Sequence, residues 1–273
     1  MSRPWFEVAF GAHYPLLYAH RNETEAARCL ELLPQLAPLT PPGSGLGVLD
    51  LGCGDGRHLS LIAKSVPVVG LDLSAPLLVA ARTRQAPGAG PIRGIVRGDM
   101  RAIPARDRAF GGVLSLFTTF GYFGKLEANS VVIKEVARVL ASGGHWFLDY
   151  LDSDRVIRDL APHPEGLIRT RVLGPCEFRE KRRLAEDRGT VIKDVTVTIR
   201  AGCEAEASTL EMDGEGLHYR EEVALFPLAE LDALAQKAGL QRVAGAGSYD
   251  GKALGDGDRW LLVFRKGRGE AGP

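Results

Sequence analysis

The chain has 273 residues, of which 45% are hydrophobic and 25% are charged, and its 34 Lys and Arg residues balance its 34 Asp and Glu residues. This composition suits a folded globular protein with a sizeable core, and it excludes wholesale disorder. The formal net charge of +0 provides no global basic surface for nucleic acid. The four cysteines form no CxxC pair, so we expect neither a disulfide framework nor a metal site.

Hydropathy gives no sign of a membrane segment. No apolar run approaches the roughly 18 residues that a membrane-spanning helix requires, and the N-terminal residues lack an apolar core followed by a small-residue cleavage site. We therefore expect a cytoplasmic protein without a membrane partner. Both a monomer and a homodimer are compatible with the sequence.

The first half of the chain predicts a helix, a loop and then alternating strands and helices. Residues 22–33 place apolar side chains at helical spacing behind Asn22, a typical N-cap residue, and the prolines and glycines of residues 34–47 predict a loop. From residue 46 onward, patterns typical of strands alternate with patterns typical of helices, which indicates a parallel, doubly wound sheet. We predict strands within residues 47–51, 67–74, 92–100, 111–117 and 145–151, and helices within 56–65, 75–86 and 127–144.

The rhythm changes in the second half. Residues 167–226 show period-two alternation, in which Val191, Val195 and Val197 fall on one face of a strand and polar residues fall on the other. We expect half-exposed antiparallel strands, whose apolar face must be covered by the mouth of the protein's own site or by a second subunit. The remaining predicted elements are a helix over residues 227–240 and strands over 241–247 and 259–267.

The segment VLDLGCGDG places three glycines directly after a short apolar run. Gly52, Gly54 and Gly56 indicate positive φ angles or a ligand that approaches the backbone, although a tight strand-to-helix turn without a ligand would also need them. A dinucleotide-binding loop requires G-x-G-x-x-G, and Arg57 occupies the position of its third glycine. The carboxylate of Asp50, two residues before the first glycine, suits a ligand with an ammonium group better than one with phosphates.

Four motifs in order resemble those of class I S-adenosylmethionine-dependent methyltransferases. The glycine loop resembles the first motif, and Asp72, within VVGLDLS, stands where the family's acid binds both ribose hydroxyls. Asp99 and Met100 resemble the pair that holds the adenine, and LSLFTTFGYF resembles the stretch that lines the methyl-transfer site. The resemblance covers residues 46–151 and, less closely, the final helix and strands. One departure is Gly111, where many relatives carry an acid in the fourth strand.

The resemblance implies an α/β fold: a doubly wound, mostly parallel seven-stranded sheet of the Rossmann-like methyltransferase type, with an inserted antiparallel β subdomain. The implied organisation is an N-terminal helical segment over residues 1–45 that covers the cofactor site, a core over 46–152 and 227–266, a lid over 153–226 that roofs the site, and a flexible tail over 267–273.

The resemblance also implies the site residues. For the cofactor S-adenosylmethionine they are Tyr14, Tyr18, Asp50, Gly52, Cys53, Gly54, Gly56, Asp72, Leu73, Asp99, Met100, Leu116 and Phe117. For the acceptor they are Thr118, Phe120, Tyr122 and Phe123. Tyr122 and His20 are the candidates for a catalytic base, since no His/Asp pair stands out. The aromatic residues among these positions can equally be core or lid packing, and we expect His58 and His145 to serve packing.

The sequence therefore predicts an enzyme that moves the methyl group of S-adenosylmethionine to a small-molecule acceptor by in-line displacement. The balanced charge favours a small molecule over nucleic acid as acceptor. Methylation at N, O or C is equally compatible with the motifs. Two alternatives are a non-catalytic S-adenosylmethionine-binding module and a nucleotide-dependent oxidoreductase, which the glycine spacing and Arg57 disfavour.

Overall fold

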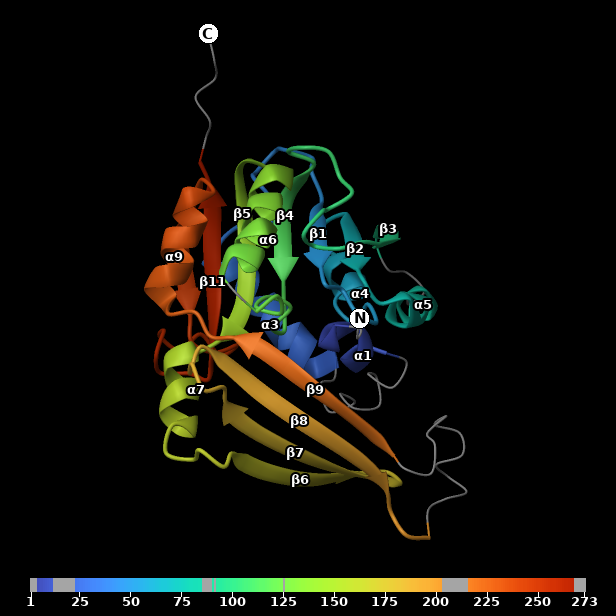
Figure 1. Ribbon diagram of the computed structural model, residues 1–273. Helices are drawn as coiled ribbons and strands as arrows, with labels where there is room; N and C mark the ends of the chain where they lie inside the picture. The colour runs from blue at the N-terminus through green and yellow to red at the C-terminus, as the bar shows by residue number, and fades with distance from the viewer. Residues whose placement is uncertain are drawn as a thin grey trace.

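The structure is a computed structural model that describes residues 4–11, 23–84, 90, 92–124, 126–202 and 216–267. Two sheets, one large and one small, dominate these residues (Figure 1). No helix within the described ranges has both the length and the hydropathy to cross a membrane.

The larger sheet has seven strands in the order β10-β11-β5-β4-β1-β2-β3. Neighbouring strands from β3 to β5 pair in parallel, whereas β11 runs antiparallel to both β5 and β10. The predicted doubly wound, mostly parallel fold is thereby confirmed. The strands are β1 (Val48–Leu51), β2 (Val68–Asp72), β3 (Ile92–Arg97), β4 (Phe110–Ser115), β5 (Leu140–Leu151), β10 (Leu240–Ala246) and β11 (Arg259–Lys266).

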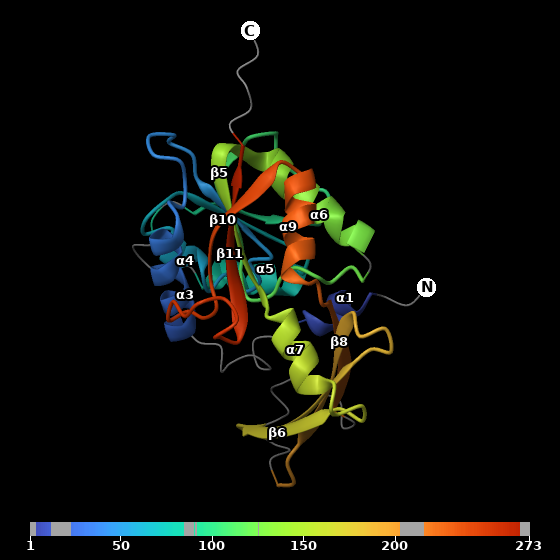
Figure 2. The ribbon, with the colours of Figure 1, turned by 90° about the vertical axis from the view of Figure 1, so that its left-hand side faces the viewer.

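Helices cover both faces of this sheet, as Figure 2 shows. The apolar stripes of α6 and α9 contribute Val132, Ile133 and Leu231 to one core cluster, and α3 and α4 contribute Leu33 and Leu59 to the cluster on the opposite face. Only the short segment α4 is helical within predicted helix 56–65, and turns flank it. The helices are α3 (Glu23–Leu36), α4 (Leu59–Ile62), α5 (Ala75–Thr83), α6 (Leu126–Val139) and α9 (Leu228–Lys237).

The smaller sheet lies between β5 and α9 in the sequence. Its four antiparallel strands are β6 (Leu167–Leu173), β7 (Cys176–Leu184), β8 (Thr190–Ile199) and β9 (Leu217–Ala224), in sequential order. The preceding helix α7 (Ser153–Leu160) packs Val156 and Leu160 on the large core.

A helix from the N-terminus covers the apolar face of the smaller sheet. Trp5 and Ala9 of α1 (Trp5–Ala9) pack against Phe178, Val195 and Val197. Figure 1 shows α1 wedged between this sheet and the carboxyl edge of the larger one. The sequence predicts the mouth of the site or a second subunit as the cover, whereas in the structure α1 packs on this face. The sequence does not indicate this contact because α1 is separated from these strands by more than a hundred residues.

Candidate functional site

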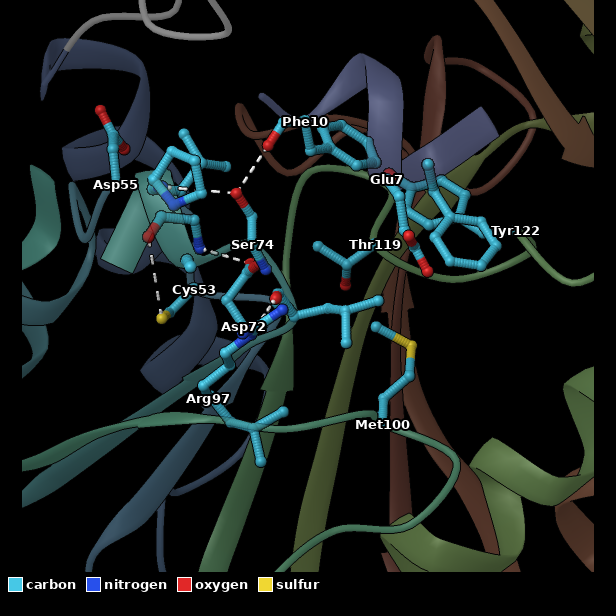
Figure 3. A pocket seen from close by; sticks show the side chains of 18 of the residues that line it. Glu7, Phe10, Cys53, Asp55, Asp72, Ser74, Arg97, Met100, Thr119 and Tyr122 are labelled. Carbon is cyan, nitrogen blue, oxygen red and sulfur yellow. Dashed lines mark hydrogen bonds between the residues drawn. The ribbon is translucent and has the colours of Figure 1, made fainter. Parts of the chain in front are cut away.

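A cavity of about 580 Å³ opens at the carboxyl ends of β1, β2, β3 and β4 (Figure 3). Its walls are the glycine loop, the segments that follow β2, β3 and β4, and the helix α1. Leu217 is the one lining residue from the smaller sheet within the described part of the chain. An open α/β sheet binds its ligand at this edge, so the cavity is the candidate active site.

The three glycines of the loop have different structural roles. All of them have positive φ angles, of 81° at Gly52, 55° at Gly54 and 77° at Gly56. A Cβ atom on Gly52 would lie 2.7 Å from Cγ2 of Thr119, and one on Gly56 would lie 2.9 Å from Cβ of Ala81, so both positions are closed by packing. A Cβ atom on Gly54 would contact only Leu77, at 3.9 Å, and would face the cavity.

Gly54 is therefore the glycine that lets a ligand approach the backbone. Gly56 does not line the cavity, although we predicted a cofactor contact there, because its missing side chain makes room for α5. Gly52 and Cys53 line the cavity as predicted, and their backbone N–H groups both donate to the carbonyl of Leu71 in β2.

Asp72, at the end of β2, ties the glycine loop to the start of α5. Its Oδ2 accepts a hydrogen bond from the N–H of Gly54 at 2.8 Å, and its Oδ1 accepts one from the N–H of Ser74 at 2.8 Å. Burial raises the pKa of this carboxyl group above its ordinary value. The carboxylate still lines the cavity, where its remaining lone pairs can accept hydrogen bonds from ribose hydroxyls.

We expect Asp72→Ala to weaken the binding of S-adenosylmethionine by about 1.5–3 kcal/mol, which is the range for hydrogen bonds to a charged group. The substitution removes the ribose acceptor and both hydrogen bonds that hold the loop. Isothermal titration calorimetry measures the affinity. Asp55→Ala is the matched control, because Asp55 also lines the cavity but pairs with Arg84 at 2.6 Å. Equal affinities for the two variants would refute the ribose assignment.

Asp50 lies beneath the glycine loop and not in the cavity wall. Its side chain is buried, and its Oδ2 has no hydrogen-bond partner among the described residues. Burial, together with the nearby charge of Asp72, raises the pKa of Asp50 to about 7. We predict Asp50 beside the amino group of the ligand, directly or through water; its carboxyl group is buried below the loop and does not line the cavity.

The raised pKa of Asp50 makes the stability of the protein depend on pH. The folded state binds a proton that the unfolded state releases near pH 4, so this stabilisation is complete below the unfolded pKa and is lost as the pH rises through about 7. Between pH 5 and pH 8 the loss is about 2–3 kcal/mol. Asp50→Asn should abolish this part of the pH dependence of the free energy of unfolding, measured by urea denaturation. Parallel pH profiles of the two proteins would contradict the prediction.

The residues predicted to hold the adenine line the cavity beyond β3. Asp99 forms an ion pair with Arg101 at 2.6 Å, and this guanidinium lowers the pKa of its carboxyl group. Met100 and Leu73 supply apolar surface, and Figure 3 shows Met100 pointing into the cavity. Arg97 also lines the cavity, although the sequence analysis did not single it out, and its Nε donates to the carbonyl of Leu73 at 3.1 Å.

The segment after β4 supplies the wall nearest to α1. Leu116, Phe117, Tyr122 and Phe123 line the cavity, in agreement with their predicted places.

Two residues of this segment lie elsewhere than predicted. Phe120 is only 1% exposed and packs in the core, 5.9 Å from the rings of Trp146 and Tyr150. Thr118 adopts a φ of 60° and donates its N–H to the carbonyl of Asp149, while Thr119 takes its place in the cavity wall. Both corrections follow from the left-handed backbone of this turn, which changes the direction of each side chain.

A buried cluster behind the cavity holds this turn in place. The carboxylate of Asp149 accepts hydrogen bonds from the N–H of Phe117 at 2.8 Å, the hydroxyl of Tyr249 at 2.6 Å and Nη1 of Arg259 at 2.6 Å. The same Nη1 also donates to the Tyr249 hydroxyl. Phe117 has a φ of 57°, which costs a non-glycine residue about 1–2 kcal/mol. No sequence motif joins these residues, so the sequence analysis missed the cluster.

Two further residues line the cavity without having been predicted there. The ring of His58 is buried, lies 5.0 Å from that of Phe117, and has no hydrogen-bond partner at Nε2 among the described residues. Burial lowers the pKa of His58, so this imidazole is neutral at physiological pH. The guanidinium of Arg57 lies 4.0 Å above the ring of Phe117. His145 is buried in the middle of β5, as expected for a packing residue.

The predicted residues Tyr14, Tyr18 and His20 lie outside the described residues. Among the residues that the structure does describe, no three His, Cys, Asp or Glu side chains are arranged to hold a metal ion.

Comparisons with known proteins agree with this geometry. Residues 48–144 match the model of the methyltransferase domain family. A Streptomyces venezuelae enzyme named dTDP-3-amino-3,4,6-trideoxy-alpha-D-glucopyranose N,N-dimethyltransferase is 32% identical over 140 residues, which are 51% of this chain and 56% of that protein. A mouse protein named probable tRNA methyltransferase 9B is 34% identical over 97 residues, which are 36% of this chain and 20% of that protein.

Among solved structures, the CcbJ methyltransferase from Streptomyces caelestis has a TM-score of 0.75, covers 96% of this chain and 99% of its own, and shares 19% sequence identity. This likeness shows the fold. The chain spans little more than half the length of the Streptomyces venezuelae relative. Residues 48–144 thus match the methyltransferase domain family, and the whole described fold is that of a solved methyltransferase structure. The open position at Gly54, the carboxylate of Asp72 and the apolar side chain of Met100 fit S-adenosylmethionine.

Proposed function

We propose that this protein methylates the amino group of a small polar acceptor of the amino-sugar type. The observation that supports this proposal is the aromatic part of the cavity wall, where Phe6 packs against Phe123 and Phe10 packs against Tyr122. Aromatic faces attract a cation, whether it is the sulfonium of the cofactor or the charge that develops on an amine during methylation. The name of the Streptomyces venezuelae relative points to the same acceptor chemistry.

When bound, S-adenosylmethionine supplies a methyl group on a sulfonium sulfur: the N–C bond forms as the C–S bond breaks, and the electron pair of that bond stays on the sulfur. The protein's own residues bind the acceptor, orient it toward the methyl group and exclude water. Such positioning can lower the activation barrier by up to roughly 7–11 kcal/mol in ideal cases. Tyr122 lines the cavity and remains our candidate for a group that moves a proton there, and His20 is the second candidate.

Product formation tests the proposal. The purified protein is incubated with S-adenosylmethionine and dTDP-3-amino-3,4,6-trideoxy-α-D-glucopyranose, with a panel of other amino sugars, with their hydroxyl counterparts and with total tRNA. S-adenosylhomocysteine and the mass of each acceptor are then measured. We expect methylation of one or more amines. Methylation confined to hydroxyl compounds or to tRNA would refute the amine acceptor, and cofactor binding without any product would favour the non-catalytic binding module.

The Asp72→Ala protein is the control for contaminating activity. A nicotinamide nucleotide that binds more tightly than S-adenosylmethionine would favour the oxidoreductase instead.

A further inference from the structure

Four acidic residues line the cavity, and three of them already have partners. Asp55 pairs with Arg84, Asp99 pairs with Arg101, and Asp72 accepts the backbone hydrogen bonds of the glycine loop and α5. The fourth is Glu7 of α1, whose carboxylate has neither an ion pair nor a side-chain hydrogen bond among the described residues. It is solvent-accessible, and Figure 3 shows it pointing into the cavity toward the space between Thr119, Tyr122 and Met100.

Aromatic residues line the same cavity as Glu7. The ring centroids of Phe10 and Tyr122 are 5.4 Å apart, those of Phe6 and Phe123 are 5.5 Å apart, and those of Trp5 and Tyr122 are 5.0 Å apart. These contacts join α1 to the segment after β4, so Glu7 lines the cavity together with the aromatic residues Phe6, Phe10, Tyr122 and Phe123. The carboxylate of Glu7 lies near the guanidinium of Arg101, whose pKa is raised first by the hydrogen bond to Asp99 and also by the charge of Glu7. A carboxylate that shares a cavity with aromatic residues favours a cationic or strongly N–H-donating group.

The position of Glu7 is set by two contacts at the C-terminal end of α1. Ala9 is buried against the smaller sheet, together with Phe178 and Val197. The carbonyl of Phe10 accepts a hydrogen bond from Oγ of Ser74 at 2.6 Å, and Ser74 is the N-cap of α5, two residues after Asp72. The helix therefore holds Glu7 at a defined place relative to the residue that we assign to the ribose.

We propose that Glu7 is the acceptor-recognising residue of this site, which receives the acceptor's amino group as a hydrogen-bond acceptor. This inference rests on the proposed function and deepens it. The neutral amine attacks with its lone pair; as the N–C bond forms, positive charge arrives on the acceptor nitrogen, the Glu7 carboxylate stabilises that charge, and the product ammonium then releases an N–H proton to water. The smaller sheet contributes to acceptor binding mainly by supporting α1.

The test compares Glu7→Gln, which keeps the size of the side chain but loses its charge, with the unmodified protein. Calorimetry measures the binding of two probes to the S-adenosylhomocysteine complex: dTDP-3-amino-3,4,6-trideoxy-α-D-glucopyranose, and its analogue with a hydroxyl group in place of the amine. Glu127→Gln is the matched control, because Glu127 is also an exposed glutamate in the first turn of a helix and lies outside the cavity wall.

We expect Glu7→Gln to lower the affinity for the amine probe by about tenfold or more, and to change the affinities for the hydroxyl probe and S-adenosylhomocysteine by no more than about twofold. The substitution should also raise KM for the amine more than it lowers kcat. Glu7→Asp should restore part of the affinity. If Glu7→Gln binds the amine probe as tightly as the unmodified protein does, the inference is overturned. Methylation of amines by the unmodified protein would still support the proposed function in that case. Weaker S-adenosylhomocysteine binding would overturn it too, by assigning Glu7 to the cofactor. A wild-type protein that neither binds nor methylates any amine of the panel would overturn both.

Discussion

Replacing Gly54 with valine is expected to abolish measurable binding of S-adenosylmethionine, a loss of more than about a hundredfold, without unfolding the protein. A Cβ atom at this position meets only Leu77, at 3.9 Å, so the branched side chain has room to form but occupies the space that the ligand needs. The backbone φ of 55° adds strain of about 1–2 kcal/mol for a residue with a Cβ atom. Calorimetry measures the affinity, and urea denaturation measures the free energy of unfolding.

Gly174→Val separates the two effects. Gly174 lies in the turn between β6 and β7, has the same φ of 55°, and has no atom within 4 Å of its Cβ position. Both variants should lose a similar amount of stability, and only Gly54→Val should lose the cofactor. Normal binding by a folded Gly54→Val protein would mean that the cofactor does not approach this part of the loop.

Replacing Asp149 with alanine is expected to cause the largest loss of stability, about 3–5 kcal/mol, because it leaves the guanidinium of Arg259 buried without a counter-charge. The side chain of Arg259 is only 14% exposed, and Asp149 is fully buried. The substitution also removes the acceptor for the N–H of Phe117, so the left-handed turn in the cavity wall loses its support. The free energy of unfolding is measured by urea denaturation.

A second ion pair of similar geometry provides the control. Asp232 pairs with Arg242 at 2.7 Å between α9 and β10, far along the chain from the cavity wall, and both side chains are about a third exposed. Asp232→Ala should cost about 1 kcal/mol or less. If the two substitutions destabilise the protein equally, burial is not what gives the Asp149 pair its importance.

Tyr249→Phe tests the same cluster with a smaller change, because it keeps the ion pair between Asp149 and Arg259. It removes the hydroxyl that donates to Asp149 but keeps the ring that packs 5.6 Å from Phe117. This variant should fold and should bind S-adenosylhomocysteine more weakly than the unmodified protein does. An unchanged affinity would show that the cluster supports the fold without influencing the site.

The sequence by itself determined the larger sheet and the cofactor side of the cavity. These features depend on local signals: apolar runs of strand length, helix caps such as Ser74, and glycines that stand directly after a strand. The position of Asp72 followed from the same logic, because the carboxyl ends of parallel strands meet at one edge of the sheet. Gly54 and Asp72 therefore lie where their motifs placed them.

Only the tertiary structure decided which of the neighbouring residues face the cavity. Thr118 and Thr119 are adjacent and chemically alike, yet the left-handed backbone at Thr118 sends only the second into the wall. Phe120 could not be distinguished from Tyr122 by sequence, because both are aromatic residues in one short turn, and packing against Trp146 settled its place.

The places of Glu7 and of the Asp149 cluster could not be predicted from the sequence for a related reason. Glu7 comes to the cavity only because α1 packs on the smaller sheet, and Asp149 meets Tyr249 and Arg259 only because β11 lies beside β5. Contacts between segments a hundred or more residues apart leave no periodic or spacing signal in a single sequence. Short-range conformational preferences therefore determined the part of the cavity formed by the glycine loop and the end of β2, and long-range packing of the chain decided the part lined by α1.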